Sequence, residues 1–376
     1  MGRLKIRGAV LEQVGKPAKY ADSRPLSVCD LELDDPAGDE ILVRIECAGI
    51  CHSDLSVING DRVRPVPMLL GHEASGIVEA VGAAVTELVP GDRVVMTFLP
   101  RCGSCRGCAS NGLLPCSEGT ATNNAGTLLS GQVRLHRGGE DVLHHLGVSG
   151  FATHAVVDKR SVVKVGHDVP PEVAALLGCA VLTGGGAVLN LAKPAPGDTL
   201  MVVGLGGVGM AALLTARALG AEVIGIDANP EKLDQALDLG ATAAYTPAEA
   251  QARSVTAPTV VEAAGSARAF ETAVAQTEPG GTTITVGLPA PTALAQISPL
   301  TLVAQARTII GSYLGSAVPS RDVPVFADLW RQGRLPVEKL VSARIGLEDI
   351  NAAMDDLAEG RALRQIIHFD GAAAAR

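Results

Sequence analysis

Four cysteines lie close together in one glycine-rich stretch of the chain. They follow the spacing C-x2-C-x2-C-x7-C and are Cys102, Cys105, Cys108 and Cys116. Four thiolates on one short loop can surround a single tetrahedral ion and leave no coordination position open, which is the form of a structural zinc site. We therefore predict that these residues hold a zinc ion. An iron–sulfur or redox role is the alternative that such a loop leaves open.

Three further candidate ligands are dispersed along the chain. Cys51 opens the run Cys51-His52-Ser53-Asp54, His72 lies between Gly71 and Glu73, and Cys179 follows Gly178. Two thiolates and one imidazole leave a fourth tetrahedral position for water or substrate, as a catalytic zinc requires. Taken one by one, such residues are more commonly packing residues. The prediction of a catalytic zinc at Cys51, His72 and Cys179 therefore rests on the joint pattern.

A glycine motif indicates a dinucleotide site. Gly204, Gly206 and Gly209 form GxGxxG directly after the apolar run Leu200 to Val203. Such glycines permit a tight turn and a close approach of the backbone to a pyrophosphate at the start of a helix. Asp227 ends the next predicted strand, where a carboxylate accepts hydrogen bonds from the adenosine ribose and repels a 2′-phosphate. This favours NAD over NADP.

Two regions of the chain, which differ in their sequence patterns, must position these residues. The first 180 residues are rich in Gly and Pro, with short alternating runs such as Ile41 to Ile45 and Gly76 to Val81, which predict a twisted β domain. From about Leu182 apolar strands alternate with helical stretches, which predicts a parallel sheet covered by helices. We expect a helix around Leu347 to Glu359 and a strand at Arg364 to Phe369.

Composition limits the class of protein. A chain of 376 residues favours two domains, and a net charge of −9 without basic runs excludes nucleic acid as an expected partner. Met1 to Lys16 has no apolar secretory core, so a cytoplasmic protein is expected. The uncharged stretch Thr199 to Ala216 reads better as a buried strand and a buried helix than as a membrane span. With 2% aromatic residues, a binding pocket must consist mostly of aliphatic side chains.

Taken together, the motifs resemble the zinc-containing medium-chain alcohol dehydrogenases, and among them the liver-type branch that includes glutathione-dependent formaldehyde dehydrogenase. The likeness runs from about Leu11 to Phe369. It implies an α/β fold in which a GroES-like, β-rich catalytic domain is interrupted by a Rossmann domain. The expected boundaries are residues 1–181 and 315–376 for the catalytic domain and 182–314 for the NAD-binding domain.

The resemblance also implies the reaction and the roles of single residues. An alcohol, expected to be primary, is oxidised reversibly to an aldehyde with NAD and two zinc ions per chain. Ser53 receives the hydroxyl proton, Asp54 orients His72, and Glu73 lies near the metal. The cofactor is expected to contact a further set of residues: His52, Thr183, Gly204, Gly206, Gly207, Val208, Gly209, Asp227, Lys232 and Arg364. The rivals are a zinc-free quinone or enoyl reductase and a non-catalytic NAD-binding protein.

The resemblance leaves the substrate open. Phe98 and the segment Asp61 to Arg64 are expected near the substrate channel, where Arg62 and Arg64 either contact a carboxylated or thiol-conjugated substrate or are solvated loop residues. Thiol-adduct-dependent formaldehyde oxidation is therefore an alternative. Many relatives carry a histidine where this chain has Ser56, so we expect the proton to leave through water at Ser56.

The stretch Ser117 to Leu146 resembles a loop of the liver-type enzymes and indicates a homodimer, with a tetramer left open. Its histidines, His136, His144 and His145, are expected at the surface or in the core, because the predicted zinc ions already have their ligands. The only other partner expected is a small-molecule alcohol or aldehyde.

Overall fold

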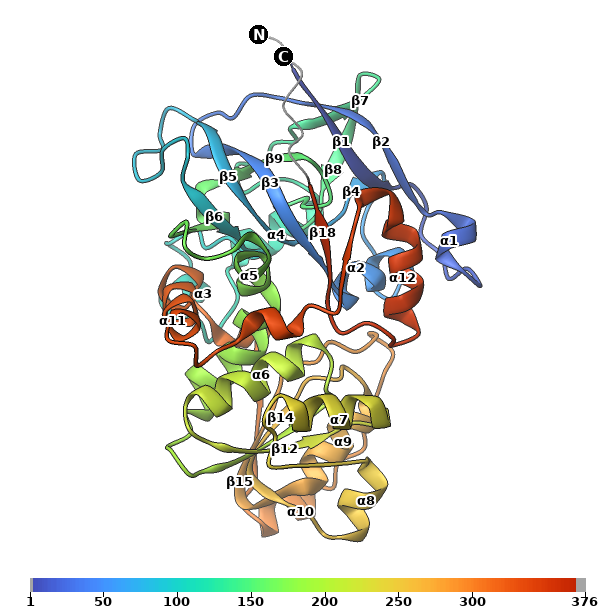
Figure 1. The fold of residues 1–376 in the computed structure, drawn as a ribbon, viewed down its shortest axis with the longest axis vertical. Helices are drawn as coiled ribbons and strands as arrows, with labels where there is room; N and C mark the ends of the chain where they lie inside the picture. Colours follow the sequence, from blue (N-terminus) through green and yellow to red (C-terminus); the bar gives the residue numbers. More distant parts are fainter. Residues whose placement is uncertain (1–2, 370–376) are drawn as a thin grey trace. The chain divides into compact units, whose positions relative to one another are not determined.

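The computed structural model describes residues 3–369, and these form two compact units (Figure 1). The first unit comprises the chain up to Cys179 and again from Val341 onward, and the second comprises Ala180–Leu340. A β-rich domain interrupted by a second domain is therefore observed, as the texture of the sequence indicates.

A small closed barrel and a seven-stranded sheet make up the first unit. The barrel strands, in spatial order, are β1 (Leu4–Leu11), β2 (Leu26–Leu33), β7 (Leu135–Arg137), β8 (Glu140–His144) and β4 (Met68–Leu69). The sheet strands are β10 (Val162–Val165), β6 (Arg93–Met96), β5 (Glu73–Val81), β3 (Glu40–Ile50), β18 (Gln365–His368) and β17 (Ala343–Ile345), with β9 (His154–Asp158) pairing with β3. Apolar residues alternate along β3, so one of its faces packs into the buried core.

The helices of the first unit are short. They are α1 (Tyr20–Ser23), α2 (His52–Ile58), α3 (Arg106–Ala109), α4 (Ser117–Ala125), α5 (Pro171–Leu176) and α12 (Ile350–Ala358), with 3-10 turns at Lys159–Ser161 and Leu347–Asp349. The expected C-terminal helix and strand are present as α12 and β18. Figure 1 shows β18, in red, beside β3, in blue, and the two strands pair antiparallel with Gln365 opposite Ile50.

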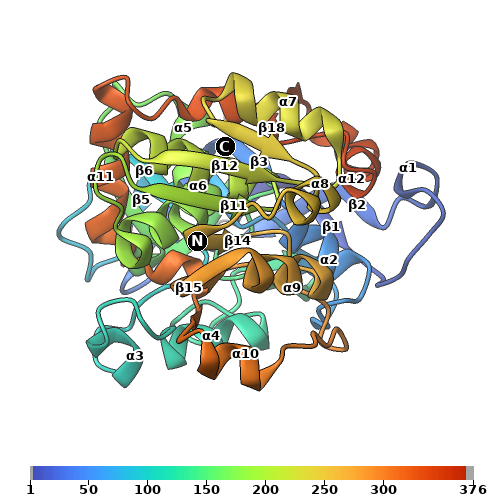
Figure 2. The same cartoon turned by 90° about the horizontal axis from the view of Figure 1, so that it is seen from below.

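A parallel six-stranded sheet forms the centre of the second unit (Figure 2). Its strands, in spatial order, are β13 (Ala243–Tyr245), β12 (Glu222–Ile226), β11 (Thr199–Val203), β14 (Ala257–Glu262), β15 (Thr277–Thr285) and β16 (Thr308–Gly311). The helices are α6 (Gly207–Ala218), α7 (Pro230–Asp238), α8 (Pro247–Ala252), α9 (Ala267–Gln276), α10 (Pro299–Ala304) and α11 (Pro319–Arg331), with 3-10 turns at Tyr313–Ser316 and Val337–Leu340. Strand order reverses between β11 and β14, which is the doubly wound arrangement of dinucleotide-binding domains.

The second unit extends past the expected boundary at residue 314. Helix α11 belongs to it because Asp322 accepts a hydrogen bond from Nδ2 of Asn190 at 3.1 Å and Arg321 donates to Oδ1 of Asn190 at 2.8 Å. Arg334 also donates to the main-chain oxygen of Ala218. These side-chain contacts connect the stretch after residue 314 to the second unit, which ends at Leu340, and the sequence pattern after Leu314 does not reveal them.

One helical stretch, Pro171–Ala192, is long and apolar enough to cross a membrane, and most of it is buried inside the protein. It consists of α5 followed by the π-helical segments Leu177–Gly185 and Ala187–Ala192. Such burial is typical of a core helix. The uncharged stretch Thr199 to Ala216 is β11 followed by α6, both largely buried, as predicted.

Candidate active site and cofactor motif

Strand ends bring the dispersed ligands together. Strand β3 ends at Ile50, directly before Cys51, and β5 begins at Glu73, directly after His72. The two strands pair antiparallel with Gly49 opposite Glu73, so the end of one meets the start of the other. Cys51 and His72 therefore lie at the same end of this strand pair.

Cys179 reaches the same end of the strand pair because the glycine before it, Gly178, permits close packing. A Cβ on Gly178 would lie 2.1 Å from the main-chain oxygen of Met96, at the end of β6, so only glycine allows the helix to pack this closely. The Sγ of Cys179 then lies 3.4 Å from Nε2 of His72. The ligand atoms of Cys51, His72 and Cys179 all lie within 4.8 Å of one another, and all three residues are buried.

Asp54 lies behind the imidazole. Its Oδ1 is 2.9 Å from Nδ1 of His72, and its Oδ2 accepts a hydrogen bond from the main-chain nitrogen of Cys51 at 3.1 Å. Burial lowers the pKa of His72, but the charge of Asp54, with the hydrogen bonds of Asp54 and Cys51, outweighs burial and raises it to about 10. The cluster thus stabilises positive charge on the side where a metal ion would bind.

A second buried carboxylate faces a buried guanidinium. Burial raises the pKa of Glu73 to about 7, against the opposing charge of Arg364, whose Nη1 lies 3.8 Å from Oε2 of Glu73. Arg364 also donates to the main-chain oxygen of Ile50 at 3.2 Å. Both residues are almost completely buried. Within its own unit, Arg364 therefore lies against the ligand cluster.

The hydroxyl residues of α2 differ in their surroundings. Ser53, which is half-buried, lies in the first turn, while the exposed His52 begins the helix. The Oγ of Ser56 donates to the main-chain oxygen of His52 at 2.8 Å. Ser56 is thus bonded to the helix backbone, which is the usual arrangement of a serine in a helix.

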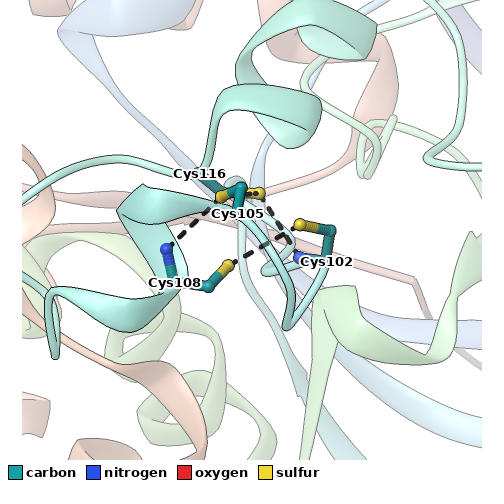
Figure 3. Close-up of side chains that lie close together, drawn as sticks. All are labelled: Cys102, Cys105, Cys108 and Cys116. Carbon is teal, nitrogen blue, oxygen red and sulfur yellow. Dashed lines mark hydrogen bonds between the residues drawn. The ribbon is translucent and has the colours of Figure 1, made fainter.

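The four clustered cysteines converge as predicted (Figure 3). The Sγ atoms of Cys102 and Cys108 lie 3.9 Å apart and those of Cys105 and Cys116 lie 3.8 Å apart. A tetrahedral zinc with Zn–S bonds of about 2.3 Å places its sulfurs about 3.8 Å apart. All eight cysteines of the chain are free thiols. The residues present therefore fit a zinc ion.

Main-chain nitrogens support these sulfurs. Cys116 accepts from the nitrogens of Cys102 and Gly119, each at 3.3 Å, and Cys105 accepts from that of Cys108 at 3.4 Å. Arg101 donates to the main-chain oxygens of Gly107 and Cys108 and so holds the loop. Donors to sulfur favour the thiolate, which is the form that binds metal.

The glycine motif of the second unit has the expected context. It follows β11 and opens α6, whose first residue is Gly207. Gly204 has φ +92°, and a Cβ on it would lie 2.5 Å from the main-chain nitrogen of Ala264. A Cβ on Gly209 would lie 1.8 Å from the oxygen of Gly204, whereas nothing lies within 4 Å of one on Gly206. The helix start therefore has open space where a pyrophosphate can approach.

Four further candidate cofactor residues, Thr183, Val208, Asp227 and Lys232, belong to the same unit, whereas His52 and Arg364 belong to the first unit. Asp227 directly follows β12 and accepts from the nitrogens of Leu205 at 2.7 Å and Asn229 at 2.9 Å. Each carboxylate oxygen keeps a second lone pair for a ribose hydroxyl. Lys232 lies in α7 and, like Thr183 and Val208, is half-buried.

Comparison with known proteins decides the family. Residues 37–167 match the alcohol dehydrogenase GroES-like domain, and residues 207–331 match the zinc-binding dehydrogenase domain. The chain is 38% identical to geraniol dehydrogenase of Castellaniella defragrans, over 97% of this chain and 98% of that protein. This chain belongs to the zinc-binding alcohol dehydrogenase family.

Two further relatives extend the comparison. NDMA-dependent alcohol dehydrogenase of Amycolatopsis methanolica is 36% identical over 97% of this chain and 99% of its own length. The crystal structure of benzyl alcohol dehydrogenase of Acinetobacter calcoaceticus matches with a TM-score of 0.87 at 33% identity, covering 97% of this chain and 99% of that one. The predicted GroES-like and α/β fold of a zinc-type alcohol dehydrogenase is confirmed. None of these three relatives carries the name of a formaldehyde dehydrogenase.

One residue beside the candidate ligands of this alcohol dehydrogenase was not predicted from the sequence. His145, expected as a packing or surface residue, lies buried beside the candidate ligand His72, with ring centroids 5.6 Å apart. The ring of Phe98, expected near the substrate channel, also contacts His72 at 5.6 Å. By contrast His144 and His136 stay away from these ligands: Nε2 of His144 accepts from the nitrogen of Arg134, and His136 pairs with two aspartates.

Two arginines in the segment after α2, Arg62 and Arg64, exert their charge on His145. Burial lowers the pKa of His145 well below its ordinary value, and the charges of His72, Arg64 and Arg62 lower it further. The main-chain nitrogen of Arg62 donates to the oxygen of Ser56 at 2.8 Å, which fixes the start of this segment on α2. Positive charge is therefore present close to the ligand cluster.

Proposed function

We propose that this alcohol dehydrogenase oxidises a primary alcohol to an aldehyde with NAD, using one zinc ion at Cys51, His72 and Cys179 and a second, structural zinc ion at the four clustered cysteines. The observation that carries the proposal is the buried group of two thiols and one imidazole whose ligand atoms lie within 4.8 Å of one another. Three ligands of this kind leave one position open for substrate.

The chain's own residues divide the work. Zinc, when bound, supplies a Lewis acid that favours ionisation of the alcohol, and NAD supplies the hydride acceptor. Asp54 holds Nδ1 of His72 and so directs Nε2 of that ring toward the two thiols. The guanidinium of Arg364 supplies a buried positive charge that faces both Glu73 and Cys51, and so offsets the negative charge of the carboxylate and the thiolate.

In this proposal the hydroxyl of Ser53 relays the proton: it accepts the proton of the alcohol and donates its own hydrogen onward in the same step, so it carries no net charge. It is the half-buried hydroxyl two residues after the ligand Cys51. Ser56 does not hold the proton, because a hydroxyl cannot carry a net charge near neutrality and its hydrogen already bonds to the oxygen of His52. Proton release past Ser56 therefore uses water.

NAD as the cofactor is supported by the GxGxxG loop with its open helix start and by Asp227 after β12. One relative is named an NDMA-dependent alcohol dehydrogenase. The test is a rate measurement with an alcohol panel and three acceptors: NAD, NADP and NDMA. Turnover with NDMA but none with added NAD would contradict the proposed use of NAD as an exchangeable acceptor.

A second candidate substrate is favoured by the arginine segment. The charges of Arg62 and Arg64 close to the ligand cluster would attract an alcohol that carries a carboxylate, including a hydroxymethyl adduct of a thiol such as glutathione. The relatives named for geraniol and benzyl alcohol favour an uncharged alcohol instead. Comparing benzyl alcohol, 4-carboxybenzyl alcohol, and formaldehyde with and without glutathione separates the three classes.

Tight NAD binding without turnover on any of these substrates would indicate a non-catalytic NAD-binding protein. The homodimer and the cytoplasmic location remain proposals from the sequence. Light scattering of the purified holoenzyme tests the oligomeric state.

A further inference from the structure

His145 lies where the barrel meets the candidate zinc ligands. It directly follows β8, which pairs with β4 so that His144 lies opposite Leu69. The chain after it runs beside the residues before His72, because Gly150 donates to the oxygen of Gly71 at 2.9 Å. The main-chain nitrogen of His145 donates to Oγ of Ser149 at 3.0 Å. The backbone of His145 is therefore placed by pairing between residues far apart in the sequence.

Its side chain points at the carboxylate behind the ligand. Nδ1 of His145 lies 3.4 Å from Oδ1 of Asp54, and both side chains are almost completely buried. The ring stands at 88° to the ring of His72. Among the described residues, no group forms a hydrogen bond of standard geometry with this nitrogen. A buried polar atom of this kind needs an explanation, since leaving it unpaired costs free energy.

We propose that His145 is a positioning residue for the metal ligand His72. The proposal rests on the proposed catalytic zinc. In it, His145 carries its hydrogen on Nδ1 and presents that hydrogen to Asp54, because a lone pair at this distance from a buried carboxylate would be repelled. Asp54 then has three donors: the nitrogen of Cys51, Nδ1 of His72 and Nδ1 of His145.

The third donor, Nδ1 of His145, lies 3.4 Å from Oδ1 of Asp54, which is longer than a good hydrogen bond. It therefore stabilises the carboxylate by electrostatic attraction and by excluding water. Two rings, His145 and Phe98, stand at nearly right angles to the ring of His72 and restrict its rotation. Asp54 fixes the same ring through Nδ1. His72 is thereby held in the orientation that directs Nε2 toward the thiols, before any metal binds.

A separate cation between Asp54, His72 and His145 is the competing interpretation, because their ligand atoms also lie within 4.8 Å of one another. Such an ion would have to replace the 2.9 Å contact between Asp54 and His72. That contact is the one that directs His72 to the thiols, so we favour the positioning role. Counting the metal ions per chain distinguishes the two.

Three substitutions in the zinc-loaded enzyme test the proposal. His145→Asn places an amide nitrogen near the position of Nδ1, His145→Gln places its amide near that of Nε2, and His145→Leu keeps bulk without a donor. The readouts are zinc retained under a chelator and the visible spectrum after cobalt replaces the catalytic zinc. We expect His145→Asn to stay within about 3-fold of wild type, and the other two to release the catalytic zinc about 10- to 100-fold faster.

Two controls accompany these variants. The zinc ion at the four cysteines should be retained in all of them, because that site is separate from Asp54, and His144→Gln changes the neighbouring histidine without altering the contact to Asp54. Equal behaviour of all three variants, whether native-like or defective, would overturn the positioning role, and three zinc ions per wild-type chain would replace it with the separate cation. The proposed function fails differently: wild type would then hold one zinc per chain and Cys51→Ser would change nothing in that count.

Discussion

Nδ1 of His72 lies 2.9 Å from Oδ1 of Asp54, and neither side chain has appreciable contact with solvent. The carboxylate accepts at the same time from the main-chain nitrogen of Cys51. One acid is thus bonded to two neighbouring candidate ligands of one metal ion. This connection makes Asp54 the most direct test of how the site is organised.

Asp54→Asn should weaken zinc binding at the catalytic site and lower kcat about 10- to 100-fold, because the amide removes the charge that holds the imidazole. The four-cysteine site should keep its zinc, so metal analysis should fall from about two ions per chain toward one. Asp30→Asn is the control, since the side chain of Asp30 is 85% exposed. An Asp54→Asn enzyme with full activity and two zinc ions would contradict the assignment.

The two zinc sites should separate by function. Cys51→Ser should abolish turnover and leave the melting temperature largely intact, whereas Cys102→Ser should mainly reduce stability and soluble yield, because its loop is held together by the four sulfurs. Metal analysis and thermal unfolding measure both. Cys29→Ser, at a cysteine outside both clusters, controls for loss of a thiol. Equal loss of fold in the Cys51 and Cys102 variants would contradict the division.

Asp227 should select the cofactor. The wild-type enzyme should use NAD at least about 10-fold better than NADP, because the carboxylate after β12 repels a 2′-phosphate. Asp227→Asn should narrow the ratio, since the amide oxygen still accepts one of the bonds from Leu205 and Asn229. The comparison is kcat/KM with both cofactors. A wild-type preference for NADP would rule out this role.

Ser53 and Ser56 should differ sharply. Ser53→Ala should slow hydride transfer about 100-fold or more, the range of a lost proton-transfer group. Ser56→Ala should cost little, because the hydroxyl of Ser56 bonds to the helix backbone. Ser56→His should speed oxidation below about pH 7 where proton release limits the rate. Single-turnover rates across pH measure all three, and a larger defect in Ser56→Ala than in Ser53→Ala would reverse the order.

His144 should make the protein sensitive to acid. Burial lowers the pKa of His144 from 6.5 to about 3, with smaller contributions from the charges of Arg134 and His136. Because the folded pKa is depressed, the unfolded chain binds a proton first, and stability falls as pH drops below about 6.5 toward 3. The loss from this residue should be about 2 kcal/mol at pH 5.

The matched variant is His144→Gln, which keeps an acceptor for the nitrogen of Arg134 but does not titrate. Urea unfolding at pH 7 and pH 5 should show a smaller difference for this variant than for wild type. An identical pH dependence in both proteins would show that His144 does not cause the effect.

Part of the site can be predicted from the sequence, because its chemistry requires particular residue types at short spacing. Four cysteines within one short loop have few other uses, and the pattern of strand, GxGxxG and helix is local, so the structure shows both arrangements. The strand expected at Arg364 to Phe369 is also local and occurs as β18. Its pairing with β3 is not local, and no sequence pattern predicts that Arg364 lies beside Glu73.

The position of His145 could not be predicted from the sequence for the same reason. Its immediate neighbours in sequence, Leu143 to Leu146, resemble any apolar stretch with two histidines. Only the pairing of β8 (Glu140–His144) with β4 (Met68–Leu69), two strands that lie far apart in the sequence, brings it to His72. Likewise, α11 joins the second unit through Asn190 and Asp322, a contact between residues far apart in the chain.

The pairing of β18 with β3 also has a consequence for biosynthesis. Arg364, the buried counter-charge of Glu73, follows Cys179 only after the entire second unit has been made. At 5 to 20 residues per second a ribosome needs about ten to forty seconds to cover that interval. For that time the nascent first unit holds thiols and a carboxylate without their guanidinium partner. Completion of the buried cluster is therefore a late step, and metal loading of the catalytic site should follow synthesis of β18 rather than accompany the emergence of Cys51 and His72.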